Sequence, residues 1–336
     1  MRTSSTIKVL GAAAAIALLA GCSSNSSTLP AGRVADQSHA RAENMRALTG
    51  VAPQFLQSIN FGHPYVHINP NTPGPKDLAV SDFAGTVEIL NRTYAPERIV
   101  TDPTGCPDGD FYDVRGRLYD ADYCGAAVTE YTPNGTLMFT YSASGLGNPV
   151  GVTTDAANNV YAVDFGGGSP SIVVEFPQGN TAPSASCATG LANEGVAVDS
   201  TGAVFVDGDD PNTGLGVILE YQNGLAGCPT PTHLGVSLGF PGGMQIDNAH
   251  NLLVCDQGAG VDIIPPPYNS ISSTITGASD TFHVAINRKN GKIFIADPSN
   301  ADVLVDLYPS GTSFAVLNSA NGLSDPAGVA TNPYPQ

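Results

Sequence analysis

Three titratable residues lie at neighbouring places in a recurring tripeptide, and their side chains have the chemistry of a metal site. Asp108 lies in "PDG", Glu194 in "NEG", and His283 ends "TFH", where most other copies have Gly. Two carboxylates and one imidazole around a common axis can hold a divalent cation, with water completing its coordination shell. The cofactor that these residues would take is Ca²⁺ or another divalent cation.

The remaining tripeptides leave an alternative open. Val150, Phe282 and Ala327 put nothing polar at the corresponding places. A catalytic site normally gathers several titratable groups around a nucleophile or a metal. We therefore assign no catalytic residue. The competing interpretation is that these side chains form a polar lining around the common axis, solvated by ordered water.

The elements that position these residues are visible as a repeat. Each tripeptide opens an apolar run that ends in Asp or Asn, at positions 113, 155, 199, 247, 287 and 332, which are 42, 44, 48, 40 and 45 residues apart. A second strand follows five of these runs, as in "LYDAD" (118–122) and "VYAVD" (160–164). A third strand such as "VVEF" and a less regular fourth come next.

Four short strands in a unit of about 40–45 residues is the period of a β-propeller blade. Six second strands, beginning with "LAVSD" (78–82), predict an all-β fold with six blades over residues 76–336. The first blade lacks an inner strand of its own. We expect "PAGVATN" (326–332) to supply that strand and close the ring, which removes open sheet edges.

The repeat also accounts for half of the acidic residues beyond residue 76. Aspartates lead the first turns and end the second strands, and further acids lie in the third strands. Asp caps tight turns because its short side chain accepts hydrogen bonds from nearby backbone N–H groups. We expect turn capping and hydrogen bonding between blades from these residues. The acidic loop "DGDDPN" (207–212) lacks the spacing of a calcium-binding loop and is interpreted as an exposed turn.

These motifs resemble the NHL-type β-propeller repeat over roughly residues 76–336. The "PDG" at Asp108 is similar to a metal-ligand element of the gluconolactonase-like propellers, and Glu194 is similar to their acidic ligand. That resemblance implies a lactonase- or lyase-like enzyme as one reading of the chain. The sequence departs from the NHL pattern in lacking the Arg before the third strand, and Gly208 replaces the usual Asp in the fourth blade.

The N-terminus has the features of an export signal. Arg2 and Lys8 flank a short apolar stretch that ends in "LAGC" (19–22). This segment resembles a bacterial lipobox, which implies cleavage of residues 1–21 and lipidation of Cys22. Residues 22–75 would then form a lipidated tether. Ser23 after the cysteine implies the outer membrane if the organism is Gram-negative, so we expect anchoring in the cell envelope.

Five cysteines remain after Cys22, and export permits disulfides. Cys106 precedes the first strand of the second blade and Cys124 follows its second strand, which places both at one face and makes a bridge reasonable. Cys187 and Cys228 lie near the fourth strands of adjacent blades and form the second candidate pair. Cys255, inside a second strand, is expected to be a buried thiol.

The charge balance limits the possible partners. The formal net charge is −17, and no Lys or Arg occurs between Arg117 and Arg288. An acidic surface repels phosphate backbones, which argues against nucleic acid. We expect a monomer that touches membrane only through its lipid anchor. The predicted function is a non-catalytic scaffold for a protein or glycan bound at a propeller face.

Overall fold

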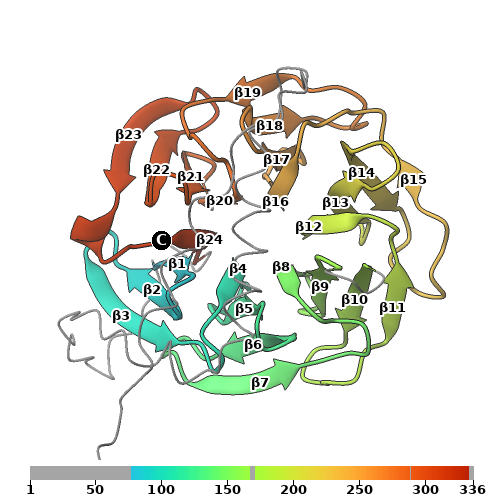
Figure 1. The fold of residues 1–336 in the computed structure, drawn as a ribbon, viewed down its shortest axis with the longest axis horizontal. Coiled ribbons are helices and arrows are strands. Elements are labelled where there is room, and N and C mark those ends of the chain that lie inside the picture. The colour runs from blue at the N-terminus through green and yellow to red at the C-terminus, as the bar shows by residue number, and fades with distance from the viewer. Residues whose placement is uncertain (1–76, 167–170, 288, 333–336) are drawn as a thin grey trace, which may run out of the picture. The chain divides into compact units, whose positions relative to one another are not determined.

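Six four-stranded antiparallel sheets surround a common centre in the computed structural model, which describes residues 77–166, 171–287 and 289–332 (Figure 1). The predicted six-bladed β-propeller is confirmed. The predicted signal peptide, the tether and Cys22 lie outside the described residues. No helix in the described part of the chain is long and apolar enough to cross a membrane.

The inner strands begin at the recurring tripeptides and contact one another around the ring. From blade 1 to blade 6 they are β24 (Pro326–Thr331), β4 (Pro107–Tyr112), β8 (Pro149–Thr154), β12 (Ala192–Val198), β16 (Pro241–Ile246) and β20 (His283–Ile286).

The outer three strands of each blade follow in chain order. Blade 1 has β1 (Leu78–Asp82), β2 (Thr86–Leu90) and β3 (Pro96–Thr101); blade 2 has β5 (Leu118–Asp122), β6 (Ala127–Tyr131) and β7 (Leu137–Tyr141); blade 3 has β9 (Val160–Asp164), β10 (Ile172–Phe176) and β11 (Ala185–Ala188). Blade 4 has β13 (Val204–Asp210), β14 (Leu215–Tyr221) and β15 (Thr232–His233); blade 5 has β17 (Leu252–Asp256), β18 (Gly260–Ile264) and β19 (Ser273–Ile275); blade 6 has β21 (Lys292–Asp297), β22 (Asp302–Leu307) and β23 (Thr312–Leu317). One 3₁₀ turn (Ser319–Asn321) leads from blade 6 into β24.

Blade 1 is closed by the C-terminal strand, as predicted. β24 pairs antiparallel with β1, with Val80 opposite Val329 and Leu78 opposite Thr331. The inner strand of blade 1 therefore begins almost 250 positions after β1 in the chain. Ala327, Val329 and Ala330 are buried there, so the closing strand also completes the apolar packing.

In four of the six blades, the aspartate that ends the second strand binds the segment that enters the same blade. Asp256 of β17 accepts hydrogen bonds from the N–H groups of Gly239 and Phe240, both at 2.9 Å, just before β16. Asp82, Asp164 and Asp297 hold the segments before β24, β8 and β20 in the same way. We call these four residues the entry clamps.

The aspartates of the first turns cap those turns, as expected. Asp247 accepts from the N–H groups of Ala249 and Asn251, both at 2.8 Å. Asp199 does the same for Thr201 and Ala203. Each cap satisfies backbone donors that the hairpin leaves without a ladder partner.

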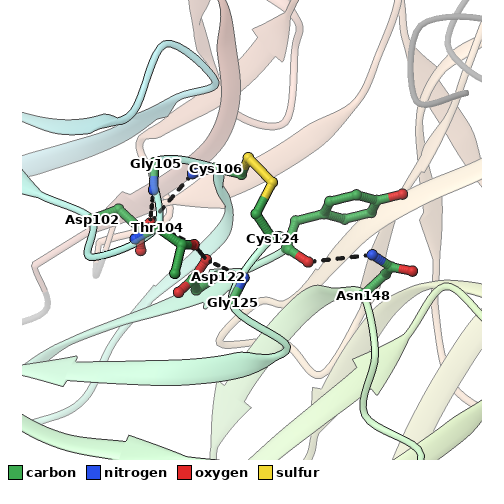
Figure 2. The surroundings of a disulfide bond; sticks show 9 residues. Asp102, Thr104, Gly105, Cys106, Asp122, Cys124, Gly125 and Asn148 are labelled. Atoms are coloured by element: carbon green, nitrogen blue, oxygen red, sulfur yellow. Dashed lines mark hydrogen bonds between the residues drawn. A yellow bond between two sulfur atoms is a disulfide. The ribbon is translucent and has the colours of Figure 1, made fainter. Parts of the chain in front are cut away.

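Both expected cysteine pairs are bonded in the structure. Cys106 and Cys124 join the segment before β4 to the turn after β5, with Cα atoms 5.4 Å apart (Figure 2). Cys187 of β11 is bonded to Cys228 in the β14–β15 connection, which links blades 3 and 4. Cys255 of β17 is buried and unbonded.

Removing the closing strand tests the dependence of the ring on β24. Deletion of residues 325–336 should destabilise the whole propeller by about 5 kcal/mol or more, comparable to the entire stability of a typical domain. The deletion exposes the inner edge of β1 and removes its buried partners. Thermal unfolding followed by circular dichroism measures the change, and deletion of residues 333–336 alone is the matched control. A truncated chain as stable as this control would show that closure does not stabilise the ring.

An entry clamp can be tested in isolation. Asp256→Ala should lower the free energy of unfolding by about 3 kcal/mol, because two charge-assisted hydrogen bonds are lost and two backbone donors lose their partner. Asp256→Asn keeps one acceptor oxygen and should lose less. Urea denaturation compares the three proteins. Equal stability of the Ala and Asn variants would argue against the clamp.

Candidate functional site

The three sequence-predicted residues lie at the starts of three inner strands. Asp108 is in β4 of blade 2, Glu194 in β12 of blade 4, and His283 opens β20 of blade 6. We call this end of the ring, where the inner strands begin, the mouth. The side chains are buried, with relative exposures of 2%, 7% and 7%, respectively.

Burial controls the charge of the two acids. It raises the pKa of Asp108 well above its usual range, and the neighbouring Asp110 raises it further. Burial likewise raises the pKa of Glu194, with Asp108 and Asp207 as the largest electrostatic contributors. The charged form of both carboxyl groups is therefore less favourable here than on an exposed surface.

His283 is held neutral. Burial lowers its pKa to about 4, and its Nδ1 accepts a hydrogen bond from the N–H of Val329 at 3.4 Å. Because Nδ1 is the acceptor, the neutral ring carries its proton on Nε2. The contact joins blade 6 to β24 of blade 1.

The imidazole of His283 occupies space that glycines leave free. A Cβ atom at Gly243 of blade 5 would collide with the His283 ring, and one at Gly109 of blade 2 would lie 3.3 Å from its Nε2. Four blades thus meet at this single side chain, since it also contacts Val329. His283 stands one position later in the recurring tripeptide than Asp108 and Glu194.

The predicted metal set is not assembled as a metal site. Among the described residues, no group of three or more His, Cys, Asp or Glu side chains is arranged to hold an ion. Asp108 still has a buried oxygen, Oδ1, with no hydrogen-bond partner within the described residues. The metal site at these residues stays a prediction.

The acidic segment 207–212 was expected to be an exposed turn, and this is wrong for its first residues, because β13 continues to Asp210 and Asp207 is fully buried. Asp207, Asp209 and Asp280, the last of which was not singled out from the sequence, all raise the pKa of Glu194. Asp207 also accepts a hydrogen bond from the N–H of Gly195 at 2.6 Å. A signal for Asp207 was present, because it stands one position before the usual Asp slot of the second strand, which Gly208 occupies.

Positive charge is confined to the opposite end of the ring. The Lys and Arg residues that the structure describes lie on blades 6, 1 and 2, in or beside the first turns and the hairpins between third and fourth strands: Arg92, Arg98, Arg115, Arg117, Lys289 and Lys292. Two of them are paired, Arg98 with Asp77 and Arg117 with Asp113. Among its described residues, the mouth therefore has acidic side chains and His283, but no Lys or Arg.

Comparisons with known proteins identify the fold and no family. No family model and no curated protein matches the chain. Solved structures do match, among them a propeller from a nidogen/laminin complex, at a TM-score of 0.64 and 15% identity over 76% of this chain and 98% of that one. A gluconolactonase from Xanthomonas campestris matches at a TM-score of 0.55 and 18% identity, over 66% of this chain and 79% of its own.

A third neighbour is also an enzyme. The virginiamycin B lyase of Staphylococcus aureus matches at a TM-score of 0.52 and 11% identity, over 74% of this chain and 85% of the lyase. These neighbours include one propeller solved in a protein complex and two enzymes. At such low identity they show a shared six-bladed architecture, and function has to be argued from the mouth itself.

The burial of His283 predicts a pH dependence of stability. Its folded pKa of about 4 lies below the ordinary value of 6.5, so the unfolded chain takes up the proton first as the pH falls. The stability due to His283 is therefore present above pH 6.5 and lost toward pH 4, by roughly 3 kcal/mol. His283→Gly, which restores the residue of the repeat, removes this contribution.

Urea denaturation between pH 4 and pH 7 measures the effect. The difference in unfolding free energy between the wild type and the Gly variant should shrink as the pH falls. A difference that stays constant over this range would show that His283 binds its proton equally in the folded and unfolded chains.

Proposed function

We propose that the protein is an envelope lipoprotein whose propeller binds a protein or glycan partner at the mouth without catalysing a reaction. The observation that carries the proposal is the state of the mouth side chains. Burial raises the pKa of Asp108 and of Glu194, and it lowers the pKa of His283, whose Nδ1 accepts a hydrogen bond from the N–H of Val329. This arrangement offers hydrogen-bonding groups to a ligand, but no activated nucleophile.

The charge distribution supports the choice of face. The described residues of the mouth hold acids alone, while the described cations lie toward the other end of blades 6, 1 and 2. A partner with many hydroxyl or amide groups can exchange hydrogen bonds with the carboxyl groups of the mouth. The nidogen propeller, solved in complex with laminin, is an example of a similar fold in a protein complex.

The cellular location rests on the sequence. The lipobox-like "LAGC" implies a lipid on Cys22, and the following segment would tether the propeller to the envelope, in the outer membrane of a Gram-negative cell. Incorporation of labelled fatty acid into the wild type, and its loss in Cys22→Ala, would test this part of the proposal separately from the binding function.

The competing function is a gluconolactonase- or lyase-like enzyme with a divalent cation at the mouth. The buried, unpartnered Oδ1 of Asp108 is the observation in its favour, because a cation would satisfy it. Such an enzyme would carry a stoichiometric divalent metal, and Asp108→Ala with Glu194→Ala would abolish it. Protein purified without chelators and free of metal would leave this alternative without support.

A photo-crosslinking experiment tests binding at the mouth. A photoreactive amino acid replacing Phe282, which is half-buried beside His283, should give discrete crosslinked products in intact cells. The same group at Val114, 65% exposed in the first turn of blade 2 at the opposite end, is the control. Products from position 114 and none from position 282 would contradict the proposal, as would the same products from both positions.

A further inference from the structure

The end of the ring opposite the mouth is divided by charge. The equivalent residues of the first turns are, from blade 1 to blade 6, Asn332, Asp113, Asp155, Asp199, Asp247 and Asn287. Blades 6 and 1 thus have an uncharged Asn, and in blade 2 Asp113 pairs with Arg117 at 2.6 Å. These three blades are neighbours in the ring, and their first turns therefore lack the net acidic charge of blades 3, 4 and 5.

The exposed charge at this end of blades 6, 1 and 2 is mainly positive. Arg92, Arg115 and Lys289 are exposed, and Lys292 is half-buried. The described acids of the same region are Asp77, Glu97, Asp113, Glu130 and Asp306. All of these acids except Glu97 are buried. A partner that approaches this region therefore meets several cations and few carboxylates.

Large apolar side chains are exposed among these cations. Val114 is 65% exposed in the first turn of blade 2, and Leu137 is 45% exposed at the start of β7. In blade 6, Leu307 ends β22 and Phe314 lies near the start of β23, with exposures of 39% and 53%. Exposed apolar surface of this kind marks interaction sites. Basic and apolar side chains on one surface are the combination that binds at the interface of a lipid bilayer.

The three blades present these side chains on one continuous surface. Lys292 of blade 6 donates a hydrogen bond from Nζ to the hydroxyl of Tyr94 in blade 1 at 2.9 Å, and its Nζ lies 3.5 Å from the centre of the Phe314 ring. Between blades 1 and 2, a Cβ atom at Gly116 would lie 3.3 Å from the side chain of Asn332. We call the surface made by the following residues the basal patch: Arg92, Val114, Arg115, Leu137, Lys289, Lys292, Leu307 and Phe314.

The chain enters the propeller at the same end. Asp77 directly precedes β1 of blade 1, and its carbonyl oxygen accepts a hydrogen bond from the N–H of Asn332 at 2.9 Å. Its carboxylate pairs with Arg98 at 3.6 Å. The residues before Asp77, Cys22 among them, are therefore attached to the end that carries the basal patch. A lipid on Cys22 would raise the concentration of this end, and not of the mouth, near the membrane.

We propose that the basal patch binds anionic phospholipid headgroups and holds the propeller against the bilayer with its mouth directed away from the membrane. The cations contact the headgroup phosphates, and the apolar side chains enter the interfacial region of the bilayer. The binding itself does not require the lipid on Cys22, whereas the orientation in the envelope rests on that proposed anchor. A partner bound at the mouth would then approach from the side opposite the membrane.

The net charge of −17 does not prevent this contact, although it led to the expectation that the protein touches membrane only through its anchor. The strands that run from the mouth to the basal patch are mostly five or six residues long. Such strands span roughly 17–20 Å, which is about twice the Debye length of about 8 Å at physiological ionic strength. The membrane is therefore screened from the acids of the mouth, and the local charge of the patch decides the interaction.

The experiment places the lipidated protein, purified from bacterial membranes, in vesicles of phosphatidylcholine with or without about 30% phosphatidylglycerol. A polarity-sensitive dye is attached to Val114→Cys in the basal patch, or to Leu215→Cys at the mouth end of blade 4, where Leu215 is 51% exposed. Cys255, the free cysteine of the described residues, is buried and should not react. The emission of the dye at position 114 should shift to shorter wavelength with phosphatidylglycerol alone, and the emission at position 215 should not shift. About 0.5 M NaCl should reverse the shift, because the Debye length falls to about 4 Å.

Two variants with the same net charge separate the patch from the charge of the whole protein. Arg92→Gln/Arg115→Gln/Lys289→Gln changes exposed side chains and should fold. Each Lys or Arg near an anionic surface strengthens binding about fivefold, so the ratio of docked to undocked protein should fall about a hundredfold. The control Gln222→Glu/Asn223→Asp/Thr230→Glu lowers the net charge equally, through exposed residues of the β14–β15 connection in blade 4. It should retain the shift.

The outcomes distinguish the basal patch from the anchor. Protein that does not associate with phosphatidylcholine alone contradicts the anchor, yet a shift at position 114 on addition of phosphatidylglycerol vesicles would still support the patch. Protein that is anchored in both kinds of vesicle without a shift at position 114 would overturn the proposal, as expected if the patch binds an acidic protein instead of lipid. Equal shifts at positions 114 and 215, or an equal loss in both triple variants, would also overturn it.

Discussion

The propeller depends on hydrogen bonds between one carboxylate of a blade and the backbone that enters the same blade. Asp82, Asp164, Asp256 and Asp297 each accept backbone N–H groups from the segment before the inner strand. Each sheet must receive its inner strand from a connection that has just left the previous blade. In blades 1, 3, 5 and 6 the clamp fixes where that connection turns, and in blade 6 it precedes the inner strand that carries His283.

Close packing at the centre is the second consequence of this arrangement. The inner strands approach so closely that a Cβ atom at Gly151 would lie 3.0 Å from the carbonyl oxygen of Glu194 in the next blade. Glycine is tolerated there because it has no side chain to accommodate. His283 is the exception at this level, and its imidazole occupies the space beside Gly243 and Gly109. The mouth acids are buried as well, which raises their pKa values.

The blade 1–blade 2 contact shows how far the repeat departs from uniform packing. Its lower part is apolar, with Val87, Ile89, Tyr112 and Tyr131 in one cluster. Its upper part contains the four carboxylates around Asp120. Replacing buried charges by apolar groups of similar size is often stabilising.

The amino-acid sequence alone determined the architecture, because a blade is a local unit. Residues close together in the chain set its strand order, turn caps and period. The six blades, the closing role of residues 326–331 and both cysteine pairs followed from that periodicity. The sequence also placed Asp108, Glu194 and His283 at one end of the ring. Only the tertiary structure decided their chemistry, since burial and the contacts of His283 across four blades involve residues far apart in the chain. The same holds for Asp110 and Asp120: the repeat marks them as exceptions, but their burial depends on the packing of blade 2 in the ring.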